Sequence, residues 1–230
     1  MHLYERLKTE TATDREYLLS APVIQRALHG AVSRDVYVEF LTQAYHHVRH
    51  TVPLLMAVGS RLPDRHRWLQ PSILHYLEEE AGHEQWILDD IAHAGGDRDG
   101  AAASRPSVAT QAMVAYAYDT VTRRNPLGFF GMVHVLEGTS VALALAAADR
   151  IQETLGLPTK AFSYLRSHGE LDQQHVGHLE GILGRIEDEH DRGAVIDCAR
   201  GIFWLYGHLF RMLDTVHAGS HTAPLLQRSA

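Results

Sequence analysis

Apolar residues recur along most of the chain at intervals of three and four, which is the period of an amphipathic α-helix. No stretch alternates apolar and polar residues between turn signals, as a half-buried strand does. The sequence therefore predicts an all-α protein. We expect helices over these residue ranges: 3–19, 22–30, 34–61 with a kink at Pro53, 71–94, 107–123, 125–155, 160–187 and 192–216.

The predicted helix ends fall on residues that favour helix starts and stops. Ser33 is a suitable N-cap, Gly30 is a suitable C-terminal residue, and the glycines at 95, 96 and 100 indicate a loop. We find no internal repeat, low-complexity tract or domain linker. At 230 residues the chain fits one domain, which we place at 1–217, followed by a flexible tail at 218–230.

Composition and charge narrow the class of protein. The net charge of −7, with no cluster of Lys or Arg, argues against nucleic-acid binding. Cys198 is the single cysteine, so the chain has neither a disulfide framework nor a CxxC metal site. The first residues are charged and lack an apolar signal core, and the longest apolar run, 141–148, is too short to cross a bilayer. We therefore expect a cytoplasmic protein that does not associate with membranes.

Two histidines and an aspartate form the pattern H-x3-D-x2-H at His168, Asp172 and His175. On a helix, offsets of four and seven residues return to nearly the same azimuth, so the three side chains share one face. That face continues in the apolar residues Leu179, Ile182 and Ile186. Imidazoles and a carboxylate on a core-facing stripe need partners, and a metal ion is one that would stabilise them.

Glu137 is the sole formally charged residue between Arg124 and Asp149. Its helical neighbours on the same face, Phe130 and Val133 among them, are apolar. A carboxylate in such a place must be protonated, paired or bound to a metal. A buried hydrogen bond to a Ser, Tyr or His of another helix is the alternative explanation.

The stretch around Glu80 and His83 adds a second carboxylate–imidazole pair. Projected at about 100° per residue, Glu80 and Glu84 fall on the apolar stripe of their helix and His83 at the margin of that stripe. Glu-x-x-His is a spacing that metal sites in helical bundles use. Glu78 and Glu79 fall off the stripe and are expected to face solvent, whereas Glu84 is a candidate supporting or alternative ligand.

His47 lies on an apolar line with Phe40 and Leu54. A single histidine on an apolar face is more often a hydrogen-bonded core residue than a ligand. We retain it as a second candidate supporting residue.

Three helices thus supply inward-facing acids and imidazoles. A mixed set of six oxygen and nitrogen ligands suits iron or manganese, and sharing it between two ions leaves positions for oxygen or substrate. A structural zinc site needs four ligands and usually favours cysteine. The candidate ligands of the metal site are Glu80, His83, Glu137, His168, Asp172 and His175.

At these residues the chain resembles the haem-oxygenase-like diiron oxidases and oxygenases, which are related in fold to thiaminase II and the pyrroloquinoline-quinone synthase. The resemblance covers roughly residues 34–214. Some members separate the first Glu and His by seven or ten residues, which would place Tyr76 or Ile73 at the Glu position. The three-residue spacing here is similar to that of the members that decarboxylate fatty acids.

The resemblance implies a single bundle of seven to eight helices holding two Fe(II) ions, with O2 as co-substrate. It also implies an unidentified electron donor and a homodimer. Our first hypothesis is a non-haem diiron oxidase or oxygenase acting on a fatty acid, an amino acid or an amine. The apolar residues near Glu137 favour an aliphatic substrate.

Two alternatives remain open. The first is a metal-free enzyme of the same fold, either a thiaminase-like hydrolase or a quinone-forming oxidase. The thiaminase branch needs a reactive cysteine, and Cys198 in the last helix is poorly placed for it. The second is a non-catalytic binding or regulatory module, in which the buried polar groups satisfy one another. Metal uptake separates these hypotheses: we expect His168→Ala or Asp172→Ala to remove one ion, and Glu79→Ala to remove none.

Overall fold

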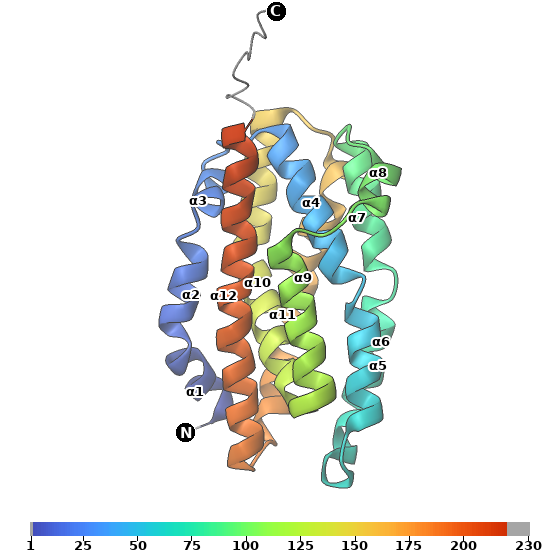
Figure 1. Cartoon of the computed structure of the whole chain (residues 1–230), viewed down its shortest axis with the longest axis vertical. Coiled ribbons are helices and arrows are strands. Elements are labelled where there is room, and N and C mark those ends of the chain that lie inside the picture. The colour runs from blue at the N-terminus through green and yellow to red at the C-terminus, as the bar shows by residue number, and fades with distance from the viewer. Residues whose placement is uncertain (1, 220–230) are drawn as a thin grey trace, which may run out of the picture.

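Helices make up every regular element that the structure describes, which confirms the all-α prediction (Figure 1). The structure is a computed structural model. It describes residues 2–219, apart from the side chains of residues 170–174 and 216–219. The α-helices are α1 (Leu3–Glu10), α2 (Ala12–Leu19), α3 (Pro22–Leu28), α4 (Arg34–Val48), α5 (Thr51–Arg61), α6 (Gln70–Glu80), α7 (His83–His93), α8 (Arg98–Ala103), α9 (Val108–Asp119), α10 (Phe129–Leu155), α11 (Ser163–Gly184) and α12 (Glu189–Gly219).

Four short elements join these helices. Three are 3₁₀ turns and one is a π-helical turn that continues α9. They are η1 (Asp64–Leu69), η2 (Thr120–Arg124, the π turn), η3 (Pro126–Gly128) and η4 (Thr159–Phe162).

The apolar helix α10 lies at the centre of the bundle and packs against α11 and α12, the second of which runs the full height of the molecule (Figure 1). Gly131 permits the close crossing of α10 and α12. A Cβ atom at that position would lie 2.2 Å from the carbonyl oxygen of Val195, which no side chain can tolerate. The segment Pro126–Leu155 is long and apolar enough to cross a bilayer, but 56% of its most apolar window is buried inside the bundle. Neighbouring helices therefore cover more than half of this window, as is usual for a helix in the core of a bundle.

The predicted helix over residues 34–61 is interrupted, because α4 ends at Val48 and α5 begins at Thr51. The break lies four residues before Pro53 rather than at it. A proline ring clashes with the carbonyl group four residues earlier and has no N–H to donate to it, so the distortion falls near Arg49. The prediction of a kink at Pro53 was therefore wrong in its position, because the helix breaks near Arg49.

The predicted helix over residues 71–94 is also divided. Residue Gly82 has φ of 93° and separates α6 from α7. That left-handed conformation is readily available to glycine alone, and it redirects the chain just after Glu80 and just before His83. A third break lies at Thr11, and the short helix α8 forms around Gly100, where we expected only a loop. The three breaks and α8 explain why more helices are present than the seven to eight expected.

A buried carboxylate fixes the start of α11. Asp90 of α7 has no exposed surface, and its side chain accepts hydrogen bonds from the backbone N–H groups of Ser163 at 3.0 Å and Tyr164 at 2.8 Å. It therefore satisfies two of the donors that an α-helix leaves without an intrahelical partner. The contact orients α11, which carries the histidine motif, against α7.

Candidate metal centre

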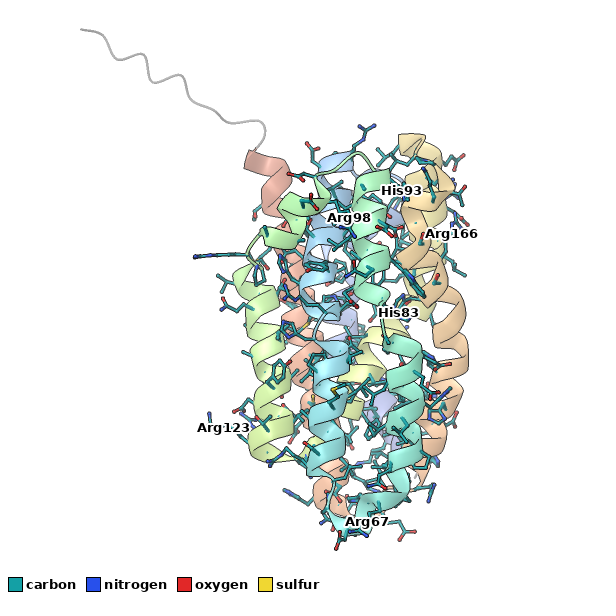
Figure 2. All side chains as sticks on the ribbon, turned by 90° about the vertical axis from the view of Figure 1, so that its right-hand side faces the viewer. Arg67, His83, His93, Arg98, Arg123 and Arg166 are labelled. Carbon is teal, nitrogen blue, oxygen red and sulfur yellow. The ribbon has the colours of Figure 1, made fainter. Side chains whose placement is uncertain are left out.

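Glu80, His83 and His168 form a compact cluster half-way along the bundle. One ligand atom from each lies within 4.8 Å of the others. Nδ1–H of His83 donates to Oε2 of Glu80 at 3.1 Å, and the imidazole rings of His83 and His168 are 4.8 Å apart. Figure 2 shows His83 where α7 begins, beside the break after α6. Bonds of about 2.0–2.3 Å place two ligands of one ion at most ~4.5 Å apart, so small rotations bring these groups to ligating distance.

Backbone geometry orients the imidazole of His168 within this cluster. Its Nδ1–H donates to the carbonyl oxygen of Tyr164, one turn earlier in α11, at 3.0 Å. The tautomer with hydrogen on Nδ1 leaves Nε2 as the basic nitrogen. Metal-binding histidines are commonly held in this way through their second nitrogen.

Glu137 and His175 form an adjoining pair. Nδ1 of His175 lies 3.4 Å from Oε1 of Glu137, and the two residues are 3% and 8% exposed. Two residues separated by 38 positions in sequence thus meet on neighbouring helices, α10 and α11. Asp172 belongs to α11, but its side chain lies outside the described residues.

The electrostatics of Glu80 favour its ionised form. Burial alone raises the pKa of this carboxyl, yet the hydrogen bond from His83 and the electrostatic influence of the nearby imidazoles of His168, His83 and His175 outweigh burial and lower the pKa overall. An ionised carboxylate among imidazoles is the donor set expected of a cation site.

Glu79 does not have the solvated environment that we expected. Its Oε2 accepts a hydrogen bond from Nε2–H of His175 at 2.7 Å, and its side chain is 31% exposed. The same oxygen lies 3.2 Å from Nε2 of His75. The amphipathic pattern of α6 missed this contact because it reports burial and not partners. The i, i+4 spacing of His75 and Glu79 was the available signal.

His47 extends into the central cavity from α4. It is 3% exposed, and neither ring nitrogen has a hydrogen-bond partner among the described residues. Burial, and to a lesser degree His168, lowers its pKa to about 3, so the ring is neutral. The alternative of a hydrogen-bonded core histidine is therefore not what the structure shows.

Glu84 takes a different position from the other candidates. It lines a surface groove with Tyr45, Arg49 and Gln85 instead of the cavity. Our projection assumed one continuous helix, and the left-handed turn at Gly82 changes the direction of every residue that follows it. The structure does not bring Glu84 to the cluster.

An apolar cavity of about 160 Å³ adjoins these groups. Glu80, Glu137, His47 and His168 are among its polar lining residues. Most of the other lining side chains are aliphatic or aromatic, and they come mainly from α3, α4, α10 and α12. Neither Lys nor Arg is among the described lining residues. An engineered apolar cavity of about 150 Å³ holds benzene, so this one accommodates an apolar body of at least that size.

The comparison with known families bears on this geometry. Residues 38–207 match the model of a family described as iron-containing redox enzymes. This chain belongs to that family. The match spans every candidate ligand on α6, α7, α10 and α11.

Solved structures share the fold at low sequence identity. A domain of unknown function with a haem-oxygenase-like fold from Shewanella denitrificans is 23% identical, with a TM-score of 0.84 and 97% of each chain covered. A TenA homologue from Pseudomonas syringae is 10% identical, with a TM-score of 0.78. The match covers 92% of this chain and 93% of the homologue.

Haem oxygenase-1 from the cyanobacterium Synechocystis, in complex with haem, is 14% identical, with a TM-score of 0.73 and 96% of each chain covered. These likenesses confirm the haem-oxygenase-like fold. No protein with a curated description matches the sequence.

The donor set of this chain fits non-haem iron. The porphyrin supplies four ligands of haem iron, and the protein adds only one or two axial side chains, often a histidine. Here one carboxylate and two imidazoles from three helices gather at one place, and the neighbouring groups lower the pKa of Glu80. Such a mixed oxygen and nitrogen set suits Fe(II) or Mn(II) bound directly by the protein.

Proposed function

We propose that this protein is a non-haem diiron oxidase or oxygenase that uses O2 to oxidise a small organic molecule. The observation that carries the proposal is the gathering of Glu80, His83 and His168 next to the pair Glu137 and His175. Each group contains carboxylate and imidazole donors, and the two groups adjoin the same apolar cavity. We assign one Fe(II) ion to each group, with Mn(II) as the alternative metal.

Bound iron supplies the capacity to activate O2. The residues of the chain would bind the metal ions and orient the substrate next to them. Glu80 and Glu137 contribute negative charge, while the histidines bind without adding any. Asp172 completes the proposed set of six ligands.

The cavity favours a substrate with an aliphatic body. A free amino acid or a guanidine would place a second charged group among aliphatic side chains, where desolvation opposes it. The described lining residues include no Lys or Arg that could neutralise a single anionic head group. The bound metal ions would therefore provide the opposite charge. His47, neutral and facing the cavity, is available to hydrogen-bond the bound molecule.

The reaction requires reducing equivalents or a substrate that supplies them, so we also propose an external electron donor. A homodimer located in the cytoplasm completes the proposal. A thiaminase-like mechanism has no support from Cys198, because that side chain is 2% exposed and does not line the cavity. Burial raises the pKa of its thiol to about 12, which opposes formation of a thiolate nucleophile.

Metal analysis after anaerobic purification and loading with Fe(II) tests the proposal. We expect about two iron ions per chain, and an optical transient when O2 is admitted. His168→Ala should lose about one of the two ions, because it removes a ligand that its own helix holds in place. The measurements are iron content and stopped-flow absorbance.

Glu78→Ala is the matched control, since Glu78 is exposed and lies on the same helix as Glu80. Its iron content should equal that of the wild type. Less than about a tenth of an iron ion per correctly folded wild-type chain would leave the metal-free alternatives instead.

A further inference from the structure

Helices α6 and α11 also bring together polar groups that contact the candidate ligand His175 on the side away from Glu137. On α6, His75 and Glu79 lie one turn apart, and Glu79 contacts His175 of α11. Nε2–H of His175 donates to Oε2 of Glu79 at 2.7 Å, and Nε2 of His75 lies 3.2 Å from the same oxygen. Glu79 and His175 are 96 residues apart in sequence.

This hydrogen bond determines which nitrogen of His175 faces the site. A neutral imidazole that carries its hydrogen on Nε2 has its lone pair on Nδ1. Nδ1 lies 3.4 Å from Oε1 of Glu137. The carboxylate of Glu79 therefore turns the basic nitrogen of His175 toward the carboxylate of Glu137, which is the arrangement that a shared cation stabilises.

Neighbouring side chains restrict both members of this contact. The ring of Tyr76 packs against His175 at 5.5 Å and against His178 at 5.5 Å, in edge-on geometry. His178 in turn lies 5.1 Å from the ring of His75. His75 holds Glu79 from the solvent side, so the carboxylate has less freedom than an isolated surface glutamate. The side chain of His175 is only 4% exposed, which distinguishes the contact from an ordinary surface ion pair.

We propose that Glu79 is a positioning residue for the metal subsite formed by Glu137 and His175. It fixes the tautomer and the ring orientation of His175 and thereby strengthens binding of the ion at that subsite. The inference rests on the proposed function for the identity of the metal site. It assigns to Glu79 a role opposite to the one that its place on the amphipathic pattern indicated.

The first arm of the test uses protein without metal, so that it does not depend on activity. Nitrogen-15 NMR reports the tautomer of each histidine, and a His175→Gln spectrum assigns the signals of His175. In the wild type we expect hydrogen on Nε2. Glu79→Ala should give a mixture of tautomers, whereas Glu79→Gln should retain the wild-type tautomer because its amide oxygen still accepts the hydrogen bond.

The second arm measures Mn(II) affinity by titration. Removal of such a supporting contact typically weakens metal binding by about 10–100-fold. We expect a loss of that size for one ion in Glu79→Ala, with the ion at Glu80, His83 and His168 unaffected, and a smaller loss in Glu79→Gln. Glu78→Ala, on the adjacent exposed position, should match the wild type in both arms. Thermal unfolding of each variant shows that it is folded.

Two results would overturn the inference: an unchanged His175 tautomer in Glu79→Ala, or affinities for both ions within about twofold of the wild type. If the wild type binds no Mn(II) or Fe(II), the proposed function fails and the metal part of the inference fails with it. The NMR arm would still decide whether Glu79 orients His175.

Discussion

At the scale of single residues, three consecutive glutamates at the end of α6 have three different environments. Glu78 is exposed, Glu79 contacts His175, and Glu80 is 9% exposed within the cluster of candidate ligands. Steps of about 100° around the helix separate their directions, so identical side chains meet solvent, a neighbouring helix and the core in turn. The sequence placed Glu78 and Glu80 correctly, and it could not identify the partner of Glu79.

His134 provides a test of how burial shifts the pKa of a histidine away from the candidate metal centre. It lies in α10 between the rings of Tyr4 and Phe203, at 5.9 and 6.1 Å. Burial, assisted by Arg15 and Lys8, lowers its pKa to about 4. The unfolded chain therefore binds this proton more tightly than the folded chain, and stability is lost as the pH falls from about 6.5 toward 4.

We expect His134→Phe to remove this component of acid sensitivity. Between pH 7 and pH 5 the wild type should lose about 1–2 kcal/mol more unfolding free energy than the variant. Urea titrations at a series of pH values measure the difference. Parallel pH profiles for the two proteins would contradict the assignment, and His190→Phe, at an exposed position, should follow the wild type.

At the scale of the elements, the interruptions of the helices position the site. The left-handed turn at Gly82 lets Glu80 end one helix and His83 begin another while their side chains remain in contact. The break between α4 and α5 follows His47 by a few residues. Long helices that change direction at the level of the cavity supply ligands that a straight helix would direct elsewhere.

Gly82→Ala tests the first of these breaks. A Cβ atom there would meet no atom within 4 Å, so the cost arises from the backbone alone. Holding alanine at positive φ costs about 1–2 kcal/mol, and we expect a loss of that size in unfolding free energy, measured by denaturant titration.

Gly181→Ala is the comparison for this variant. A Cβ atom at Gly181 also meets no atom within 4 Å, but the residue lies in regular helix. It should stabilise the protein by roughly 0.5–1 kcal/mol. If the two substitutions changed the unfolding free energy equally, the backbone at Gly82 would tolerate a side chain and the prediction would be wrong.

At the scale of the whole molecule, packing leaves an apolar cavity beside the polar centre. Apolar residues from helices distant in sequence line it, among them Ile24, Val36, Ala144 and Phe210. Its shape and its lack of Lys and Arg among the described lining residues depend on the joint placement of α3, α4, α10 and α12. Under the proposed function, substrate selection is therefore a property of the assembled bundle.

Ala144→Phe should fill part of this cavity, because Ala144 is 5% exposed and lines it. We expect binding of a ten-carbon fatty acid to Mn(II)-loaded protein to weaken by about tenfold or more, which corresponds to the ~1–3 kcal/mol cost of overpacking. Metal content should remain unchanged. Ligand-induced shifts in unfolding temperature measure the effect, with lysine as a charged comparison ligand.

Ala146→Phe serves as the control, since Ala146 is exposed on the same helix. It should bind the fatty acid as the wild type does. If both variants bind alike, or if lysine shifts the unfolding temperature more than the fatty acid, the aliphatic assignment is wrong.

The sequence by itself determined the helical class and the helices that carry His168, Glu137 and Glu80. These features follow from periodicity within one segment, where each residue constrains its neighbours three and four positions away. Tertiary structure alone decided the contact of Glu79 with His175, the departure of Glu84 from the site and the extent of the cavity. Each depends on how separate helices pack and where they break, and residues 96 positions apart share no local constraint that a pattern could record.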